Sequence, residues 1–273
     1  MTWTRAYGSA MNEANMTDHG IQQLLAIMAQ LRRDCPWDQV QTPASLTRYA
    51  IEEAYEVEAA VRSGDAAAVC DELGDLLLQV VFQAQMYQEQ GAFEFADVVA
   101  GLQAKLIRRH PHVFADGSAE DAEAVVVAWD AIKQTERQGQ RRRLDHVKAG
   151  SGLMQAQDLQ KQAAKVGFDW PDVSGAQAKL HEEIAELEQA IDSQDLAAIT
   201  DELGDCLFAV VNVARKLNIQ SEQAILGTVH KFKSRFAYIE DELAKRDTTP
   251  EHSSLAEMDL LWEQAKTVLK TAG

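Results

Sequence analysis

The sequence predicts an all-α protein built from two similar helical bundles. Apolar residues recur at helical spacing along most of the chain. The five prolines all fall between these periodic segments and not inside them. A pattern of acidic residues in the first half returns 130 residues later with unchanged spacing. The spacing predicts the fold class, and the repeat predicts two copies of one unit.

The helical elements follow from local patterns. Residues 21–31 and residues 73–84 each place apolar side chains on one helical face. In each half, a helix ends in a short polar turn, residues 63–65 or 193–195, whose final Asp is a favourable N-cap for the next helix. A turn this short makes the two helices antiparallel. Residues 125–127 have a strand-like composition, but no alternating partner run accompanies them.

Composition excludes several classes of protein. A length of 273 residues suits two domains, and 46% hydrophobic with 25% charged residues is typical of globular proteins. No apolar run reaches the roughly 20 residues of a membrane helix. A net charge of −17 argues against nucleic acid as the main ligand, because non-specific DNA affinity comes from Lys and Arg. Cys35, Cys70 and Cys206 match no zinc or disulfide pattern, and no signal-peptide core is present, so we expect a cytoplasmic protein.

The repeat also predicts the domain boundaries. We expect a flexible N-terminal tail over residues 1–17 and a first domain over residues 18–138. An arginine run and a Gly-Ser-Gly sequence predict a linker over residues 139–152, followed by a second domain over residues 153–273.

The repeated acidic motif predicts a metal site in each half. EEAYE is followed by DELGD, and EEIAE is followed by DELGD, with 16 residues from the last Glu of the first box to the Glu of the second in both halves. Residues three apart share a helical face, so antiparallel helices would bring four carboxylates together. Like charges repel, and carboxylate oxygens favour Mg²⁺ or Mn²⁺. A single acidic box is more often a solvated face, but the duplication favours metal binding. The expected ligands are Glu53, Glu56, Glu72 and Asp75, and Glu183, Glu186, Glu202 and Asp205.

Basic and aromatic residues repeat as well. A Lys and an Arg four residues apart would share one helical face and suit anionic oxygens, and a Trp could stack on a flat ring. Surface ion pairing and core packing are the ordinary alternatives for such residues. Trp37 and Trp170, upstream of the acidic helices, fit either a base-covering role or packing at the helix entrance. The repeated residues are Lys105, Arg109 and Trp129, and Lys231, Arg235 and Trp262.

These motifs resemble the MazG nucleoside triphosphate pyrophosphohydrolases. EEAYE, EEIAE and DELGD match the EExxE and ExxD signature, which all-α dUTPases and phosphoribosyl-ATP pyrophosphohydrolases share. The flanks CPWDQVQTPASL, KLIRRHPHVF and KVGFDWPD extend the likeness over nearly the whole chain. The resemblance implies an all-α fold, a homodimer, Mg²⁺ dependence, and hydrolysis of NTP or dNTP to the monophosphate and pyrophosphate.

The resemblance also implies roles for individual residues. In the second half, the four acids above would hold metal, Lys179, Lys231 and Arg235 would bind phosphates, and Trp262 would contact the nucleoside. Ala198 departs from the family pattern, which often has a basic residue there, and Tyr49 stands in the first half where the second has Lys179. We therefore expect the second half to be the principal catalytic domain.

The expected chemistry is attack of water on the α-phosphorus. Glu182, or one of the carboxylates such as Glu183 or Glu186, would orient or deprotonate that water. Cleaning of the nucleotide pool and regulation of it are both compatible tasks. Two other interpretations stay open: a metal-stabilised helical dimer that binds a protein or senses nucleotides, and a diphosphate-preferring or dUTP-specific hydrolase.

Overall fold

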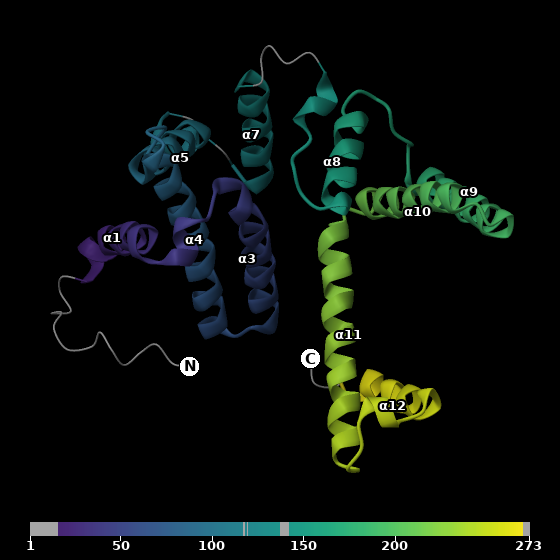
Figure 1. Ribbon diagram of the computed structural model, residues 1–273. Helices are drawn as coiled ribbons and strands as arrows, with labels where there is room; N and C mark the ends of the chain where they lie inside the picture. The colour runs from purple at the N-terminus through teal and green to yellow at the C-terminus, as the bar shows by residue number, and fades with distance from the viewer. Residues whose placement is uncertain (1–15, 117, 119, 137–141, 270–273) are drawn as a thin grey trace. The chain divides into compact units, whose positions relative to one another are not determined.

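A computed structural model describes residues 16–116, 118, 120–136 and 142–269 of the chain. Every regular element in these residues is a helix, which confirms the predicted all-α class (Figure 1). The chain divides into two compact units, residues 1–137 and 138–273. None of the described helices is long and apolar enough to span a bilayer.

The first unit is organised around an antiparallel helical hairpin, α3 and α4, with α1 and α5 packed on α4. Its core joins side chains of α1, α3 and α4, and Met28, Leu46 and Val81 are among the most deeply buried. The helices of this unit are α1 (Met16–Asp34), α2 (Pro36–Gln39), α3 (Pro43–Ser63), α4 (Ala66–Glu89), α5 (Phe95–Arg109), α6 (Pro111–Phe114) and α7 (Ala122–Glu136).

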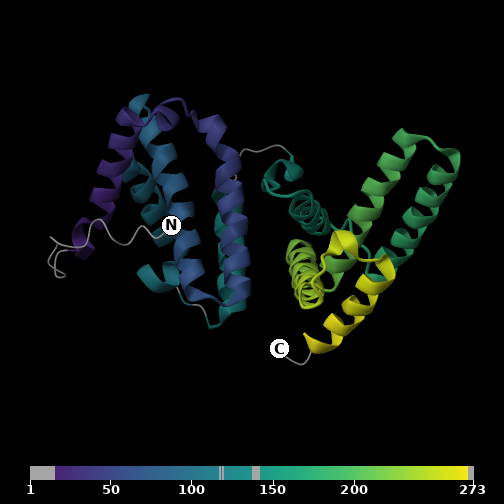
Figure 2. The same ribbon diagram turned by 60° about the horizontal axis from the view of Figure 1, so that its bottom comes forward.

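The second unit contains a matching hairpin, α9 and α10, with α8 packed on α10. Helix α11 leads away from the hairpin, and α12 folds back against α11 (Figures 1 and 2). A small core of Ile239, Leu243 and Leu261 joins α11 to α12. The helices are η2 (Arg143–His146), α8 (Gly152–Ala164), α9 (Val173–Ser193), α10 (Leu196–Lys216), α11 (Ser221–Ala244), η3 (Pro250–His252) and α12 (Leu255–Val268).

Both hairpins close with the same turn. Gly64 and Gln194 adopt the left-handed conformation, with φ of 76° and 58°, and each ends the first helix. Asp65 and Asp195 then cap the second helix, and each side chain accepts a hydrogen bond of 2.9 Å from the backbone N–H two residues later. The predicted Asp N-caps are confirmed, and the turn aligns the two helices of each hairpin in the same register.

The predicted tail and linker each overlap a helix of the structure. Helix α1 begins at Met16, just inside the predicted tail, and residues 1–15 lie outside the described part of the chain. The predicted linker, residues 139–152, contains the short helix η2, and residues 137–141 are likewise not described. Leu144 of η2 lines a cavity of the second unit, so part of this segment belongs to the packed unit.

Candidate metal centre and adjacent cavity

Each hairpin brings three carboxylates together. One oxygen from each side chain lies within 4.8 Å of the others, in the groups Glu53, Glu56 and Glu72, and Glu183, Glu186 and Glu202. The sequence predicted four carboxylates in each group, but Asp75 and Asp205 lie outside them. Asp has one methylene fewer than Glu, so its carboxylate reaches less far across the hairpin. Asp205 instead lines the cavity beside the second group.

Burial and charge in these groups fit a cation. Glu183 is 5% exposed, and Oε2 of Glu202 is buried with no hydrogen-bond partner among the described residues. Burial, followed by the hydrogen bond with Glu183 and its charge, raises the pKa of Glu186. Burial and the charges of Asp75 and nearby glutamates likewise raise the pKa of Glu53. An all-oxygen site of this kind suits Mg²⁺ or Mn²⁺.

A lysine stands beside the second group. Nζ of Lys179 lies 2.8 Å from Oε1 of Glu182 and 2.6 Å from Oε1 of Glu183. These hydrogen bonds, with Glu182 first, raise the pKa of Lys179. In the first unit the corresponding residue is Tyr49, and the guanidinium of Arg48 lies 4.5 Å from the centre of its ring. Only the second of the two hairpins therefore places an ammonium group at this position.

A cavity of about 550 Å³ opens beside this lysine. Lys179, Glu183 and Asp205 line one part of it. The rest is lined largely by apolar and aromatic side chains from α8, α10 and the loop before α9, among them Phe168, Trp170 and Phe208. Trp170 was a candidate from its sequence position, whereas two polar residues of the lining, Gln160 and Asn212, were not predicted. The available signal was the amide of Asn212 within an apolar stretch of α10, whereas α8 contains several glutamines and its sequence does not single out Gln160.

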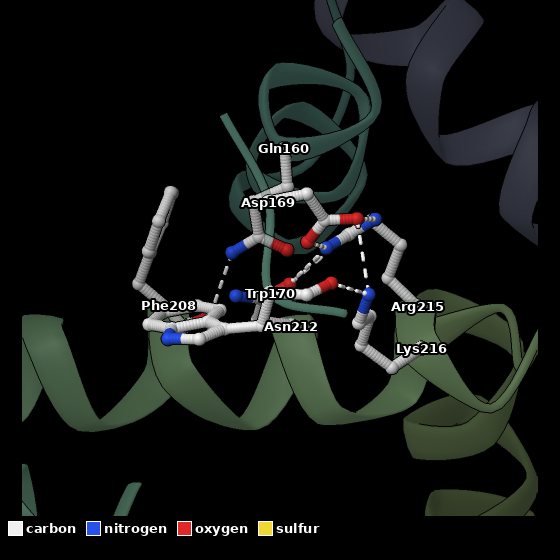
Figure 3. Close-up of polar contacts among 7 residues, drawn as sticks. All are labelled: Gln160, Asp169, Trp170, Phe208, Asn212, Arg215 and Lys216. Atoms are coloured by element: carbon white, nitrogen blue, oxygen red, sulfur yellow. Dashed lines mark hydrogen bonds and ion pairs between the residues drawn. The ribbon is translucent and has the colours of Figure 1, made fainter. Parts of the chain in front are cut away.

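An ion-pair network fixes the loop before α9 to the end of α10 (Figure 3). Oδ1 of Asp169 lies 2.5 Å from Nη2 of Arg215, and Oδ2 lies 3.1 Å from Nζ of Lys216. Arg215 also donates to Oδ1 of Asn212, from Nε at 2.9 Å. The Arg215 hydrogen bond is the main cause that lowers the pKa of Asp169 to about 2.

The other basic and aromatic candidates of the second unit lie apart from its carboxylates. Lys231 and Arg235 are on α11, which leaves the hairpin, and Trp262 is on α12 (Figure 1). The guanidinium of Arg235 lies 5.3 Å from the centre of the Trp262 ring. Trp262 also packs against Phe232, with ring centres 5.0 Å apart, and against the α11–α12 core. The structure thus joins Arg235 to Trp262 but does not bring them to the acidic group of the same unit.

The corresponding residues of the first unit lie on separate helices. Lys105 is exposed on α5, and Arg109 is near the end of that helix. Trp129 on α7 packs edge-on against His110, with ring centres 5.0 Å apart. None of the described contacts of Lys105 or Trp129 joins it to Glu53, so their predicted substrate contacts stay predictions.

Fold and site together define a class: all-α proteins in which paired helices present EExxE and ExxD carboxylates to one another. A family model for the MazG nucleotide pyrophosphohydrolase domain matches residues 41–114 and 174–239. Both matches contain a complete acidic hairpin. The chain belongs to the MazG nucleotide pyrophosphohydrolase family, which confirms the predicted resemblance and the prediction of a nucleotide-hydrolysing enzyme.

Two curated relatives match this chain over nearly their full lengths. A nucleoside triphosphate pyrophosphohydrolase of Escherichia coli K12 is 43% identical over 256 residues, covering 90% of this chain and 97% of the relative. The nucleoside triphosphate pyrophosphohydrolase/pyrophosphatase MazG of Thermotoga maritima is 39% identical, covering 92% and 98%. The protein YabN of Bacillus subtilis is 41% identical over 96% of this chain but only 55% of its own length.

Proposed function

We propose that this protein hydrolyses nucleoside triphosphates, NTP or dNTP, to the monophosphate and pyrophosphate with the help of Mg²⁺. The observation that carries the proposal is the buried oxygen of Glu202 without a hydrogen-bond partner, next to Glu183 and Glu186 and beside a cavity that contains Lys179. The names of the Escherichia coli and Thermotoga relatives support a triphosphate as the substrate.

The residues would divide the work as follows. Glu183, Glu186, Glu202 and Asp205 would hold Mg²⁺, or Mn²⁺ in its place. When bound, the ion supplies polarisation of the α-phosphoryl oxygen and a lower pKa for water. Lys179 would exchange its carboxylate partners for phosphate oxygens, which suit its ammonium group.

The bond changes are those of a single displacement. The water oxygen bonds to the α-phosphorus, the bond from that phosphorus to the bridging oxygen breaks, and pyrophosphate leaves with the bridging oxygen. Glu182, or else Glu183 or Glu186, would take the water proton. Glu182 is held beside the site by Lys179, and its side chain remains 57% exposed, so water can reach it.

We assign the main catalytic role to the second half. Lys179 supplies a cation there, whereas Tyr49 occupies the equivalent place in the first half. The first half keeps its three clustered glutamates, so a second candidate function applies to it: a metal-stabilised unit that senses nucleotides or binds a protein.

We further propose a homodimer that completes the phosphate site. Apolar side chains on the second hairpin are left exposed, including Leu203, Leu207 and Val210 on α10. Lys231, Arg235 and Trp262 are on α11 and α12, apart from the carboxylates of their own unit, and a second copy would bring such groups to them. Light scattering coupled to gel filtration tests this state, and a monomer at micromolar concentration would refute it.

A cytoplasmic location is also part of the proposal. Cys35, Cys70 and Cys206 are all free thiols, and Cys70 is exposed, which suits a reducing compartment. The task proposed there is cleaning or regulation of the nucleotide pool.

Pyrophosphate release from a panel of NTPs and dNTPs with Mg²⁺ tests the activity. Hydrolysis in ¹⁸O-labelled water should label the monophosphate and not the pyrophosphate. Glu183→Gln and Asp205→Asn should abolish turnover and leave the helical circular dichroism intact. Glu188 is an exposed acid of α9 outside the group, and Glu188→Gln should retain turnover. Full activity in both site variants would refute the assignment.

A further inference from the structure

The cavity beside the carboxylates of the second unit has aromatic walls that suit a flat ring, and we refer to this cavity as the seat. Trp170 and Phe208, both drawn in Figure 3, line it. The same cavity of about 550 Å³ reaches Lys179, Glu183 and Asp205. A triphosphate held at Lys179 and the carboxylates would therefore have its nucleoside end next to the aromatic side chains. Aromatic walls of this kind stack on bases without regard to sequence.

Two buried amides give the seat a polar edge. Gln160 is 7% exposed, and its Nε2 donates to the carbonyl oxygen of Phe208 at 2.9 Å. That bond fixes the amide orientation, and Oε1 of Gln160 is buried without a hydrogen-bond partner in the described part of the chain. A buried acceptor left unpaired costs about 1–3 kcal/mol, so this atom calls for a donor from a ligand.

Asn212 supplies the complementary group. It is 8% exposed, and its Oδ1 accepts hydrogen bonds from Nε and Nη2 of Arg215 at 2.9 and 2.7 Å. These bonds fix the orientation of the Asn212 amide and leave Nδ2 as a donor for a ligand. The cavity thus offers an acceptor from Gln160 and a donor from Asn212, each held in place by a second partner.

Trp170 is held in place as well. A Cβ atom on Gly175 would lie 2.2 Å from Cδ1 of Trp170, so the absence of a side chain on the first turn of α9 lets the indole lie against the helix. Lys216 donates to the carbonyl oxygen of Trp170, and Asp169, the preceding residue, is paired with Arg215. The wall of the seat is therefore pre-formed.

The first unit has no amide at the position that corresponds to Asn212. Residues 82 and 212 occupy matching places, seven residues after the last Asp of each DELGD motif, and residue 82 is Phe. Phe82 is 3% exposed and packs in the core with Met28 and Leu46, and the ring of Trp37 lies 6.5 Å from it. Apolar side chains fill in the first unit the position from which Asn212 reaches the cavity in the second.

We infer that this cavity seats the nucleobase of the substrate, with Trp170 and Phe208 beside the ring, a base N–H donating to Gln160 and a base nitrogen or oxygen accepting from Asn212. The inference rests on the proposed function and deepens it. Each common base carries a donor next to an acceptor on its pairing edge, so such a seat admits several bases. It distinguishes nucleoside triphosphates from polyphosphates that lack a base.

Asn212→Asp is the sharpest test, because it keeps the size of the side chain and the oxygen bound by Arg215 but replaces the donor with an acceptor. We expect kcat/KM for nucleoside triphosphates to fall about 10- to 100-fold, mainly through KM. Binding of magnesium tripolyphosphate, which has no base, should be unchanged by calorimetry. Asn218→Asp, the same change at an exposed position after α10, is the matched control.

Gly175→Ala tests the wall separately. Ala is favoured over Gly inside a helix by about 1 kcal/mol, so the variant should fold, while the new methyl group displaces the indole. We expect a rise in KM for nucleoside triphosphates and none for tripolyphosphate binding. Gly101→Ala on α5, where a Cβ meets nothing within 4 Å, is the control.

The outcomes separate this inference from the proposed function. Unchanged KM in both site variants, or equal losses for nucleoside triphosphates and tripolyphosphate, would overturn the seat while leaving hydrolysis standing. If the wild-type protein released no pyrophosphate, hydrolysis would fail, and calorimetry with nucleoside monophosphates in EDTA would decide the seat. Binding that Asn212→Asp weakens about tenfold would support it, and absence of binding to the wild type would refute it.

Discussion

Nζ of Lys179 lies 2.6 Å from Oε1 of Glu183, a carboxylate whose side chain is only 6% exposed. The lysine therefore neutralises a group that is also a proposed metal ligand. A cation at the carboxylates and the ammonium group of Lys179 compete for the same oxygen until a phosphate gives the lysine another partner.

Lys179→Met should change metal affinity and catalysis in opposite directions. Without nucleotide, Mg²⁺ should bind about two- to tenfold more tightly, because a nearby positive charge is removed. With nucleoside triphosphate, kcat/KM should fall about tenfold or more, because a charge-assisted phosphate contact is lost. Calorimetry and pyrophosphate release measure the two effects, and Lys161→Met on the exposed face of α8 is the control. A parallel loss of both would contradict the competition.

Glu186→Gln should stabilise the metal-free protein. Burial and Glu183 raise the pKa of Glu186, which means that the folded state disfavours its charge at neutral pH. Neutralising it should raise the melting temperature in EDTA and reduce the further rise produced by Mg²⁺. For the wild type, Mg²⁺ at about 100 times its Kd should add ~2.7 kcal/mol to the free energy of unfolding. A variant less stable than the wild type in EDTA would be incompatible with this account.

Asp169→Asn should weaken the second unit in a pH-dependent way. Arg215 and Lys216 hold the pKa of Asp169 at about 2, below the ordinary value of 3.8. Because the folded-state pKa is the lower one, this stabilisation is complete above the ordinary value and is lost as the pH falls through about 2. At pH 7 the variant should lose about 1–3 kcal/mol, since two largely buried cations lose their partner.

Urea unfolding across that pH range measures the effect of Asp169. The difference between wild type and variant should shrink steadily as the pH is lowered from 3.8 toward 2. Asp192→Asn, at an exposed position on α9, should show no comparable change. A difference that is independent of pH would mean that the ion pairs are not its source.

The two halves should respond unequally to the same substitution. Glu183→Gln should lower turnover by at least on the order of 100-fold, as expected for loss of a metal ligand. Glu53→Gln, at the equivalent position, should leave more than half of the turnover, because the first half has Tyr49 in place of Lys179. Steady-state rates of pyrophosphate release compare the two variants directly, and equal losses of turnover would contradict a principal role for the second half.

Local patterns predicted the fold and the carboxylate groups well. Three-residue spacing and a three-residue turn determine where Glu183, Glu186 and Glu202 lie, because both act within one hairpin. The close group of carboxylates does not include Asp205, which lines the adjacent cavity beside Glu183, and its role as a metal ligand stays a prediction.

The rest of the site depends on packing between distant segments. Gln160 and Asn212 come from α8 and α10, and no local motif joins them. Their presence in one cavity depends on how α8 packs on α10, and the orientation of the Asn212 amide depends on its hydrogen bonds with Arg215. The position of Trp262 depends on the direction of α11, which sequence spacing does not specify.

The capped turn between α9 and α10 also constrains the length of the chain between the two acidic boxes. Each residue of an α-helix advances the side-chain direction by about 100°. One residue inserted between Asp195 and Glu202 would leave the helix intact but turn Glu202 away from Glu183 and Glu186. Such an insertion would preserve every functional side chain and the helical content, yet it would separate the three carboxylates by rotation alone. The same insertion after Lys216, beyond α10, would leave the three carboxylates together.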